Sequence, residues 1–260
     1  MLNNSIQKTL LVSLLLCLVC SILVSVSVVM LNKQQEENKA LDVKRNLLMA
    51  TRLIDATATK DDIVEAYKKI EMRMIDLEKG DFTSDVDPQK YDLKKSRKDP
   101  KENIAIATSN DVANIKFRSK FSSVYFVKEN GVTTQIVLPV YGKGLWSTMF
   151  GFLSLAPDLK TVKGFQFFEH GETPGLGGEV DNPNWQKIWP GKNVYDDQFH
   201  TKIDIVKGKV TNNPHKDFQV DGLSGATLTS NGVENLLHYW LGHDGFLKFL
   251  QNIKSRGDIK

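Results

Sequence analysis

The sequence contains very little cysteine. Its 260 residues include only Cys17 and Cys20, both near the start of the chain. The rest of the chain therefore lacks the thiolates that hold iron–sulfur clusters, which excludes Cys-ligated clusters from that part. It also offers no disulfide pattern that would report on the compartment. The C-x-x-C spacing itself falls within an apolar run, where packing is a more common role than redox chemistry.

Several motifs of enzymes and nucleotide-binding proteins are also missing. The sequence has no H-E-x-x-H or G-x-S-x-G motif, and Gly142-Lys143 does not complete a P-loop. Gly175-Leu176-Gly177 lacks the third glycine of a dinucleotide fingerprint, and no P-C-x-x-C follows His170-x-Glu172, as a zinc deaminase would require. The net charge of +3 comes without a basic stripe, so we expect no nucleic-acid partner.

Charge is absent from one long stretch near the N-terminus. Residues 9–31 contain no charged side chain and are mostly Leu, Val and Ile. A helix of this length can cross the ~30 Å hydrocarbon core of a lipid bilayer. We therefore predict a short tail at 1–8 and one transmembrane anchor at 9–31. The run is long and has no small-x-small cleavage site, which favours an uncleaved anchor over a signal peptide.

The charges that flank this run give a prediction of orientation. Lys8 and the amino terminus precede it, whereas four basic residues follow it within a short distance, namely Lys33, Lys39, Lys44 and Arg45. The more basic side of a membrane helix usually faces the cytoplasm. Counting charges alone therefore favours a cytoplasmic location for the large C-terminal part.

Helix-forming residues continue beyond the anchor. Residues 32–53 are rich in Gln, Glu, Lys, Ala and Leu, which predicts a helical stalk. We expect a second helix after Asp61-Asp62, with one apolar face from Ile63 to Leu77 and an end at Gly80. Charge and two prolines dominate up to residue 102. We interpret 60–102 as a helical and loop excursion of an extramembrane domain spanning 54–260.

The pattern changes to strands after residue 120. Four β-rich runs are separated by turn residues and predict consecutive antiparallel strands, at 123–128, 132–141, 150–156 and 161–168. An irregular or short helical piece at 182–192, a strand at 203–206, a helix after Ser224 and a terminal helix from about residue 244 follow. A block of strands with helices at both ends indicates an α+β fold, with an antiparallel sheet flanked by helices and preceded by one transmembrane helix.

The stretch from Asp221 to Ser230 leads into an amphipathic helix. Its apolar residues recur at i, i+3, i+4, i+7 and i+8, from Val233 to Leu241. The first turn of such a helix exposes unpaired N–H groups and the positive end of the helix dipole, which suits a phosphate. A simpler interpretation is that Ser224 or Asp221 only caps the helix.

Two glycine-bearing loops lie among the strands. The first, Tyr141 to Thr148, is either a hairpin turn whose Trp146 covers the core or a surface that presents Trp146 and Ser147 to a ligand. The second, His170 to Glu179, has four glycines within eight residues, so its backbone can lie flat against a planar ligand. Glu172 and Thr173 in this loop can hydrogen-bond polar ring edges.

Taken together, these motifs resemble those of a known family. Asp221 followed by Ser224-Gly225-Ala226-Thr227 resembles the D-x-x-S/T-G-A-T/S signal at which a flavin transferase esterifies the phosphate of FMN onto the last hydroxyl. An N-terminal anchor, G-x-G-L-W-S, E-T-P-G-L-G and this signal occur in one order. The ordered set resembles the FMN-binding C subunit of the bacterial Na+-translocating NADH:quinone oxidoreductase.

The resemblance implies a cofactor and its binding residues. FMN would be bound covalently through its phosphate to Thr227, and neither a catalytic residue nor a metal ligand is expected in this chain. The ring would lie near one group of residues, namely Trp146, Ser147, Glu172, Thr173, Leu176 and Gly177. The phosphate side would be formed by Asp221, Ser224, Gly225 and Ala226.

The resemblance also implies a setting. The chain would be anchored in the lipid of the bacterial inner membrane with its domain on the periplasmic side, opposite to the side that charge counting favours. Its partners would be the other membrane, flavin and iron–sulfur subunits of the reductase, with a flavin transferase needed for maturation. Its role would be an electron relay that is coupled to sodium export.

Two alternatives remain open at this stage. The FMN subunit of the related ferredoxin:NAD+ ion pump shares the anchor and the S-G-A-T sequence, although the segment 63–102 and the residues of the two loops favour the sodium pump. A member of a different class, an anchored flavin-binding sensor or scaffold without turnover, would carry the same motifs. Co-purified partners would separate these possibilities.

Overall fold

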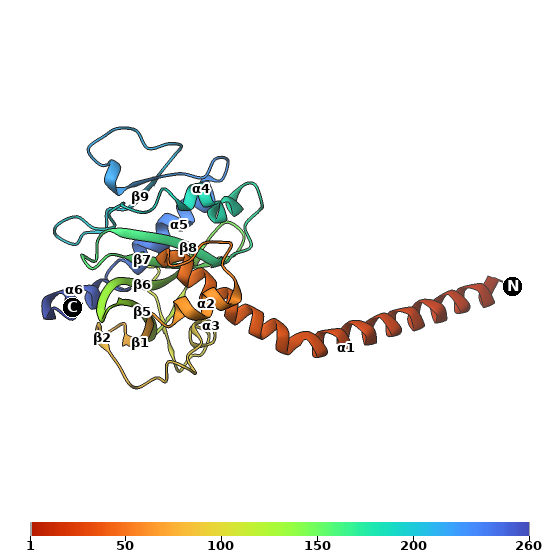
Figure 1. Cartoon of the computed structure of the whole chain (residues 1–260). Helices are drawn as coiled ribbons and strands as arrows, with labels where there is room; N and C mark the ends of the chain where they lie inside the picture. The colour runs from red at the N-terminus through yellow and green to blue at the C-terminus, as the bar shows by residue number, and fades with distance from the viewer. Residues whose placement is uncertain (1, 260) are drawn as a thin grey trace. The chain divides into compact units, whose positions relative to one another are not determined.

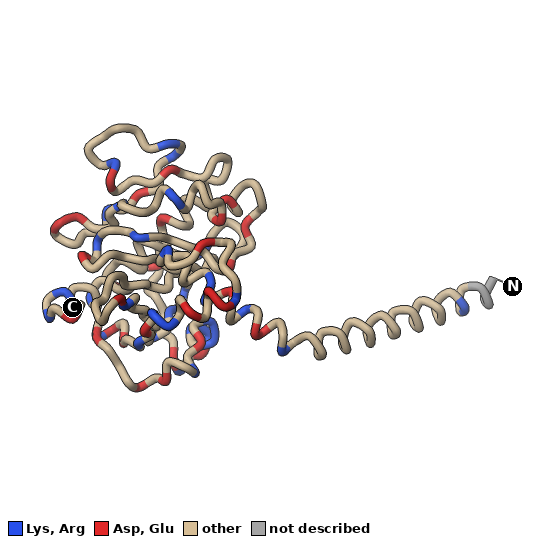
Figure 2. Tube along the Cα trace, viewed as in Figure 1, with Lys and Arg blue, Asp and Glu red and all other residues tan. Residues whose placement is uncertain are grey.

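The computed structural model describes residues 2–259 and divides at Val43 into two compact units (Figure 1). Helix α1 (Leu2–Thr51) makes up the whole described part of the first unit. Its segment from Ile6 onward is long and apolar enough to cross a membrane. No charged residue lies between Lys8 and Lys33 in the sequence, and Figure 2 shows a long part of this helix without Lys, Arg, Asp or Glu colour. The structure thus agrees with a single N-terminal anchor that continues as a helix beyond residue 31.

The last two turns of α1 belong to the core of the second unit. Leu47, Leu48 and Ala50 are almost fully buried. The Gln135 side chain donates a hydrogen bond from Nε2 to the Thr51 carbonyl at 3.0 Å, which fixes the end of the helix against the sheet. The helix ends there because Arg52 adopts a left-handed backbone conformation, with φ of 61°.

A six-stranded sheet forms the centre of the second unit (Figure 1). Its order is β2-β1-β5-β6-β7-β8, and every neighbouring pair is antiparallel. The strands are β1 (Ile70–Asp76), β2 (Asp81–Phe82), β5 (Phe121–Glu129), β6 (Val132–Lys143), β7 (Thr148–Leu155) and β8 (Val162–Glu169). The four predicted strands after residue 120 are confirmed as β5 to β8.

The hairpin between β5 and β6 shows why these strands could be predicted. Asn130 and Gly131 form a two-residue loop, and both have positive φ, at 52° and 82°. Asn-Gly is the pair that best tolerates this geometry, and its twist matches that of the flanking strands. A short local signal therefore fixes the register of Glu129 opposite Val132.

The predicted helix from Asp61 to Gly80 is wrong over its second half. Helix α2 (Lys60–Tyr67) begins with Thr59 as its N-cap, which forms a capping box with Asp62. The chain then turns into β1, which pairs with β2 on one side and β5 on the other. Apolar residues in Ile70–Asp76 satisfy helical spacing and strand alternation equally well, so pairing across the sheet decides the outcome.

The remaining short elements lie around this sheet. Between β2 and β5 the chain forms helix α3 (Leu93–Ser96) and an antiparallel pair of strands, β3 (Asn103–Ala105) and β4 (Phe117–Ser119). After β8 come η1 (Gly177–Asp181), α4 (Pro183–Gln186) and η2 (Lys216–Phe218), together with a parallel pair of strands, β9 (Asp204–Val206) and β10 (Gln219–Asp221).

Helix α5 (Thr227–Trp240) packs on β6, and α6 (Leu247–Arg256) follows it. The predicted apolar stripe is confirmed, since Val233, Leu236 and Leu237 have no exposed surface. Helix and strand come very close at two glycines. A Cβ added to Gly142 would lie 2.5 Å from the Cβ of Leu236, and one added to Gly232 would lie 2.6 Å from the Lys143 carbonyl oxygen. The predicted α+β fold is thereby confirmed.

Candidate functional site

Thr227 is the first residue of α5, and its side chain is exposed. The residue before it, Ala226, has no side-chain group that could cap the helix. Within residues 2–259, no acceptor is found for the backbone N–H groups of Thr227, Leu228 and Thr229. The start of α5 therefore presents a free hydroxyl beside free N–H groups at the positive end of the helix dipole.

A tight turn precedes Thr227 at the start of α5. The Ala226 N–H donates to the Leu223 carbonyl at 3.1 Å, and Gly225 has a φ of 72°, a conformation that glycine adopts without strain. The Leu223 N–H donates to the hydroxyl of Ser230 at 3.0 Å, one turn into the helix. Ser224 and Gly225 lie exposed at the tip of the turn. The S-G-A-T sequence thus forms a surface turn that is tied back to its own helix.

Glu172 joins the two glycine-bearing loops to this helix. Its Oε1 accepts hydrogen bonds from the N–H groups of Trp146 at 3.0 Å and Ser147 at 3.3 Å. Its Oε2 accepts from the N–H of Leu145 at 3.2 Å and from the hydroxyl of Thr229 at 2.8 Å. The structure therefore brings together the three predicted segments, which are far apart in the sequence.

Two further contacts fix these segments against one another. The Gly171 N–H donates to the Ser147 hydroxyl at 2.6 Å, which joins the first loop to the second. A Cβ on Gly225 would lie 3.3 Å from a methyl carbon of Leu176, so the second loop also reaches the turn before α5. Thr173 is exposed, and its carbonyl accepts from the N–H groups of Leu176 and Gly178, which closes the loop on itself.

The electrostatics of the site depend on two groups. Burial alone would raise the pKa of Glu172, but the hydrogen bonds from Thr229 and from the loop N–H groups outweigh it and lower the pKa below its usual value. The hydrogen bond from His170 Nε2 to Asp181, at 2.8 Å, is the largest cause that raises the pKa of His170. His170 Nδ1 accepts from the Glu172 N–H at 3.2 Å, so the proton of the neutral ring lies on Nε2.

Asp221 lies away from the tip of the turn. It ends β10, and its Oδ1 accepts a hydrogen bond from the Val210 N–H at 2.8 Å. Its carbonyl accepts from the indole N–H of Trp185 at 2.8 Å. Within the described residues, Asp221 therefore holds the segment that leads into the turn, whereas Ser224 and Thr227 lie at the surface.

Two residues of the site were missed by sequence reasoning. Thr229 binds Glu172, but its hydroxyl was one of several in the S-G-A-T-L-T-S string. Gly232 lets α5 approach the end of β6 next to the first loop. A glycine inside a predicted helix costs stability relative to alanine, and this was the signal that could have pointed to a close contact.

The segments that meet at the start of α5 carry exposed apolar side chains. Trp146 is 66% exposed, Leu228 61% and Leu176 46%, and they come from the first loop, from α5 and from the second loop. Isolated exposed apolar residues are ordinary, but three from the converging segments of one site form a surface suited to a flat apolar ligand. The first loop thus presents Trp146 outward and does not use it to cover the core.

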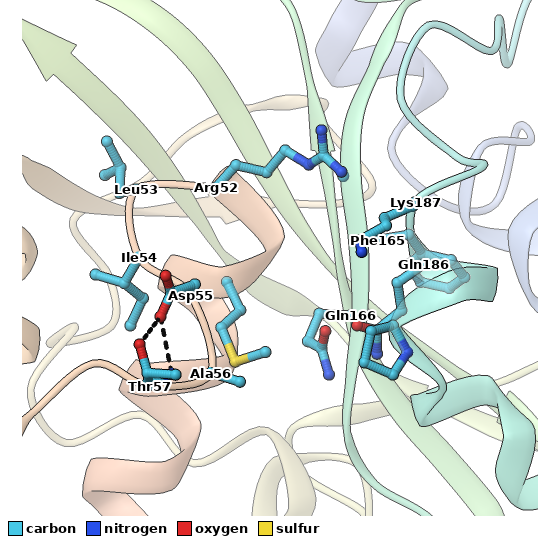
Figure 3. A pocket seen from close by; sticks show the side chains of 13 residues that line it. Arg52, Leu53, Ile54, Asp55, Ala56, Thr57, Phe165, Gln166, Gln186 and Lys187 are labelled. Carbon is cyan, nitrogen blue, oxygen red and sulfur yellow. Dashed lines mark hydrogen bonds between the residues drawn. The ribbon is translucent and has the colours of Figure 1, made fainter.

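A separate cleft of about 690 Å³ lies elsewhere on the second unit (Figure 3). It is lined by the loop after α1, by β8 and by residues near α4, including Arg52, Asp55, Gln166 and Lys187. None of the predicted site residues lines it. The site around Thr227 is therefore an open surface and not a wall of this cleft.

Comparison with known proteins assigns the class. The family model described as the FMN-binding domain matches residues 144–242, which include every predicted site residue. Together, the fold and this match define an FMN-binding domain protein with one N-terminal helix able to anchor it in a membrane.

Relatives over nearly the full length narrow this class. The C subunit of the Na(+)-translocating NADH-quinone reductase of Pseudomonas aeruginosa is 46% identical, covering 97% of this chain and 98% of its own. The protein of the same name from Neisseria meningitidis serogroup B is 40% identical, covering 98% and 97%. This chain belongs to the NqrC family, which comprises the C subunits of Na+-translocating NADH-quinone reductases.

A solved structure agrees with this assignment. The crystal structure of Shewanella oneidensis NqrC has a TM-score of 0.77 and 32% sequence identity, covering 84% of this chain and 99% of that chain. The α+β fold is thus that of the family.

Proposed function

We propose that this chain relays electrons in the reductase complex through an FMN that is esterified by its phosphate to Thr227. The observation that carries the proposal is the exposed Thr227 hydroxyl at the start of α5, beside N–H groups that have no acceptor among the described residues. When bound, FMN supplies chemistry that moves one or two electrons at a time. The role of the protein is to bind, orient and shield the FMN.

The described residues fit such a group. The exposed turn Ser224-Gly225-Ala226 leaves space for a phosphate, and the helix dipole favours its negative charge by roughly 0.3–1 kcal/mol at an exposed site. Trp146 and Leu176 offer exposed apolar surface for a planar ring, with Ser147, Glu172, Thr173 and Gly177 beside them. Asp221 holds the turn from behind through Val210.

We propose that the domain lies on the periplasmic side of the membrane, where covalent attachment of FMN has a physical advantage. A domain in the periplasm, held by its anchor in the inner membrane, meets little free FMN. A site of ordinary affinity would therefore stand partly empty, and an ester bond removes this loss. We infer that a flavin transferase makes the bond at the D-x-x-S-G-A-T sequence, where Thr227 is accessible on the surface.

The contribution of this chain to sodium export is indirect in our proposal. Its relatives carry the name of a Na(+)-translocating reductase. Residues 9–31, however, contain no charged side chain. Ion paths through membranes are usually marked by ionisable residues, so we place the sodium path in other subunits, with this chain carrying electrons between their centres.

Mass spectrometry of the full chain, made together with a flavin transferase, tests the proposal. The peptide that contains Thr227 should carry the mass of FMN less one water, and a fluorescent band should persist on a denaturing gel. Thr227→Ser keeps a hydroxyl and should keep the band, whereas Thr227→Val has a similar shape without the hydroxyl and should lose it. A fluorescent band from the Val variant, or flavin on another peptide, would overturn the proposal.

A further inference from the structure

Glu172 is a buried carboxylate that is fully occupied by protein donors. Only 5% of its surface is exposed. Its two oxygens accept four hydrogen bonds, three from backbone N–H groups of residues 145–147 and one from Thr229. A carboxylate offers about four lone-pair sites in total, so little capacity is left for a further partner.

The surrounding backbone is shaped to admit this side chain. A Cβ added to Gly144 would lie 2.5 Å from Oε1, and one added to Gly177 would lie 2.9 Å from Oε2. Neither distance is compatible with a normal contact. Two glycines of the loops therefore make room for one carboxylate, and any larger residue at either position would displace it.

Among the described residues, Glu172 has no salt bridge to a basic side chain. His170, which interacts with it electrostatically, carries a charge only when its ring is protonated. Hydrogen bonds from N–H and O–H groups satisfy the oxygens without removing the negative charge of the carboxylate itself. Such a charge opposes the addition of electrons to a nearby group and lowers its reduction potential.

We propose that Glu172 is a positioning residue that acts on FMN without bonding to it. Its carboxylate holds the Trp146 loop against the first turn of α5, and its negative charge keeps the reduction potential of the flavin low. This inference rests on the proposed flavin site. Residues 145–147 would be held in place before any flavin is attached.

Hydrogen exchange of the flavin-free chain tests the positioning role. The full chain is purified in detergent after expression without a flavin transferase, and exchange is followed at the amides of Leu145, Trp146 and Ser147. Removal of hydrogen bonds to a charged group in Glu172→Ala should speed their exchange by about tenfold or more. Glu172→Gln keeps an acceptor for two of the three amides and should show a smaller effect.

Matched variants separate the loss of the hydrogen bonds to Glu172 from a general loss of stability. Thr229→Val should speed exchange at the same amides less strongly, and Thr229→Ser, which restores the hydroxyl, should return it to the unmodified rate. Glu169→Gln removes an exposed carboxylate three positions away, which pairs with Lys94 and makes no hydrogen bond to residues 145–147, so it should change nothing in this segment. Equal exchange in Glu172→Ala and the unmodified chain would overturn the positioning role.

The midpoint potential of the flavin-loaded full chain tests the role of the charge. Glu172→Gln has nearly the same shape but no charge, and should raise the potential, whereas Glu169→Gln should not. The same potential in both variants would overturn the electrostatic half of the proposal. Because the exchange experiment uses no flavin, its result stands even where the flavin proves to be attached elsewhere, so the two proposals fail separately.

Discussion

The indole N–H of Trp240 donates a hydrogen bond to the backbone carbonyl of Tyr141 at 2.7 Å, across 99 positions of sequence. Both side chains are buried, and their ring centroids lie 4.7 Å apart. The bond joins the last residue of α5 to β6, at the end of the helix away from Thr227. Together with the close packing at Gly142 and Gly232, this contact fixes α5 on the sheet.

Replacement of Trp240 by Phe should therefore destabilise the domain. A buried carbonyl without its partner costs about 1–3 kcal/mol, and the lost ring volume adds to this. For a domain of this size we expect Tm to fall by about 2–4 °C for each kcal/mol lost. Thermal unfolding of the full chain, followed by circular dichroism, measures the change.

Trp146→Phe is the matched control, because Trp146 is 66% exposed and its indole N–H can bond to water. Its Tm should stay close to that of the unmodified chain. A similar fall in both variants would show that the bond to Tyr141 contributes nothing special.

Gly232→Ala tests the close approach of α5 to β6. Alanine is intrinsically better than glycine within a helix by about 1 kcal/mol, so helix propensity alone predicts stabilisation. The new methyl group would instead meet the Lys143 carbonyl oxygen at 2.6 Å and push the helix from the strand. We expect a lower Tm and, on the proposed function, a smaller fraction of chain carrying covalent flavin.

The neighbouring exposed position Asn231 provides the comparison for this variant. Asn231→Ala changes the same helix without touching the strand and should leave Tm unchanged or slightly raised. If Gly232→Ala behaved like Asn231→Ala, the contact between helix and strand would not limit the fold.

The His170–Asp181 pair predicts a pH dependence. The hydrogen bond to Asp181 raises the pKa of His170 above its usual value of 6.5. A raised pKa in the folded state means that proton binding stabilises the fold, with the full effect below about pH 6.5 and its loss as pH rises through the folded value. Asp181→Asn should therefore lower Tm at pH 6 and have much less effect at pH 8.

An NMR titration of the His170 ring measures the same quantity directly. Its midpoint should lie above 6.5 in the unmodified chain and fall in Asp181→Asn. A greater Tm difference at pH 8 than at pH 6 would contradict the sign of the predicted shift.

Much of the fold followed from local patterns in the sequence. The Asn130-Gly131 turn and the alternating residues on either side of it defined β5 and β6, and the spacing of Val233 to Leu241 defined α5. Strand β1 was missed because the spacing of its apolar residues fits both a helix and a strand. Only its pairing with β2 and β5 makes it a strand. The local sequence does not show which strands will pair with it.

The same limit applies to the site. The glycine-rich loop and the S-G-A-T turn were recognisable as segments, but the four donors to Glu172 come from Thr229 and from residues 145–147, which lie 57 and 25–27 positions away. Composition of its own loop suggested that Glu172 would face a ligand. The folded chain shows that both of its oxygens are used by other segments, a fact that only tertiary structure provides.

The chain separation between β6 and α5 also determines when the domain can form during synthesis. Residues 132–143 leave the ribosome long before the helix that covers them, and such distant pairing must overcome the entropy of closing a long loop. Until α5 is synthesised, β6 lacks the helix that packs on it and can contact other chains or chaperones. On the proposed function, the turn that receives the flavin is among the last parts of the chain to be synthesised, so the flavin is added late.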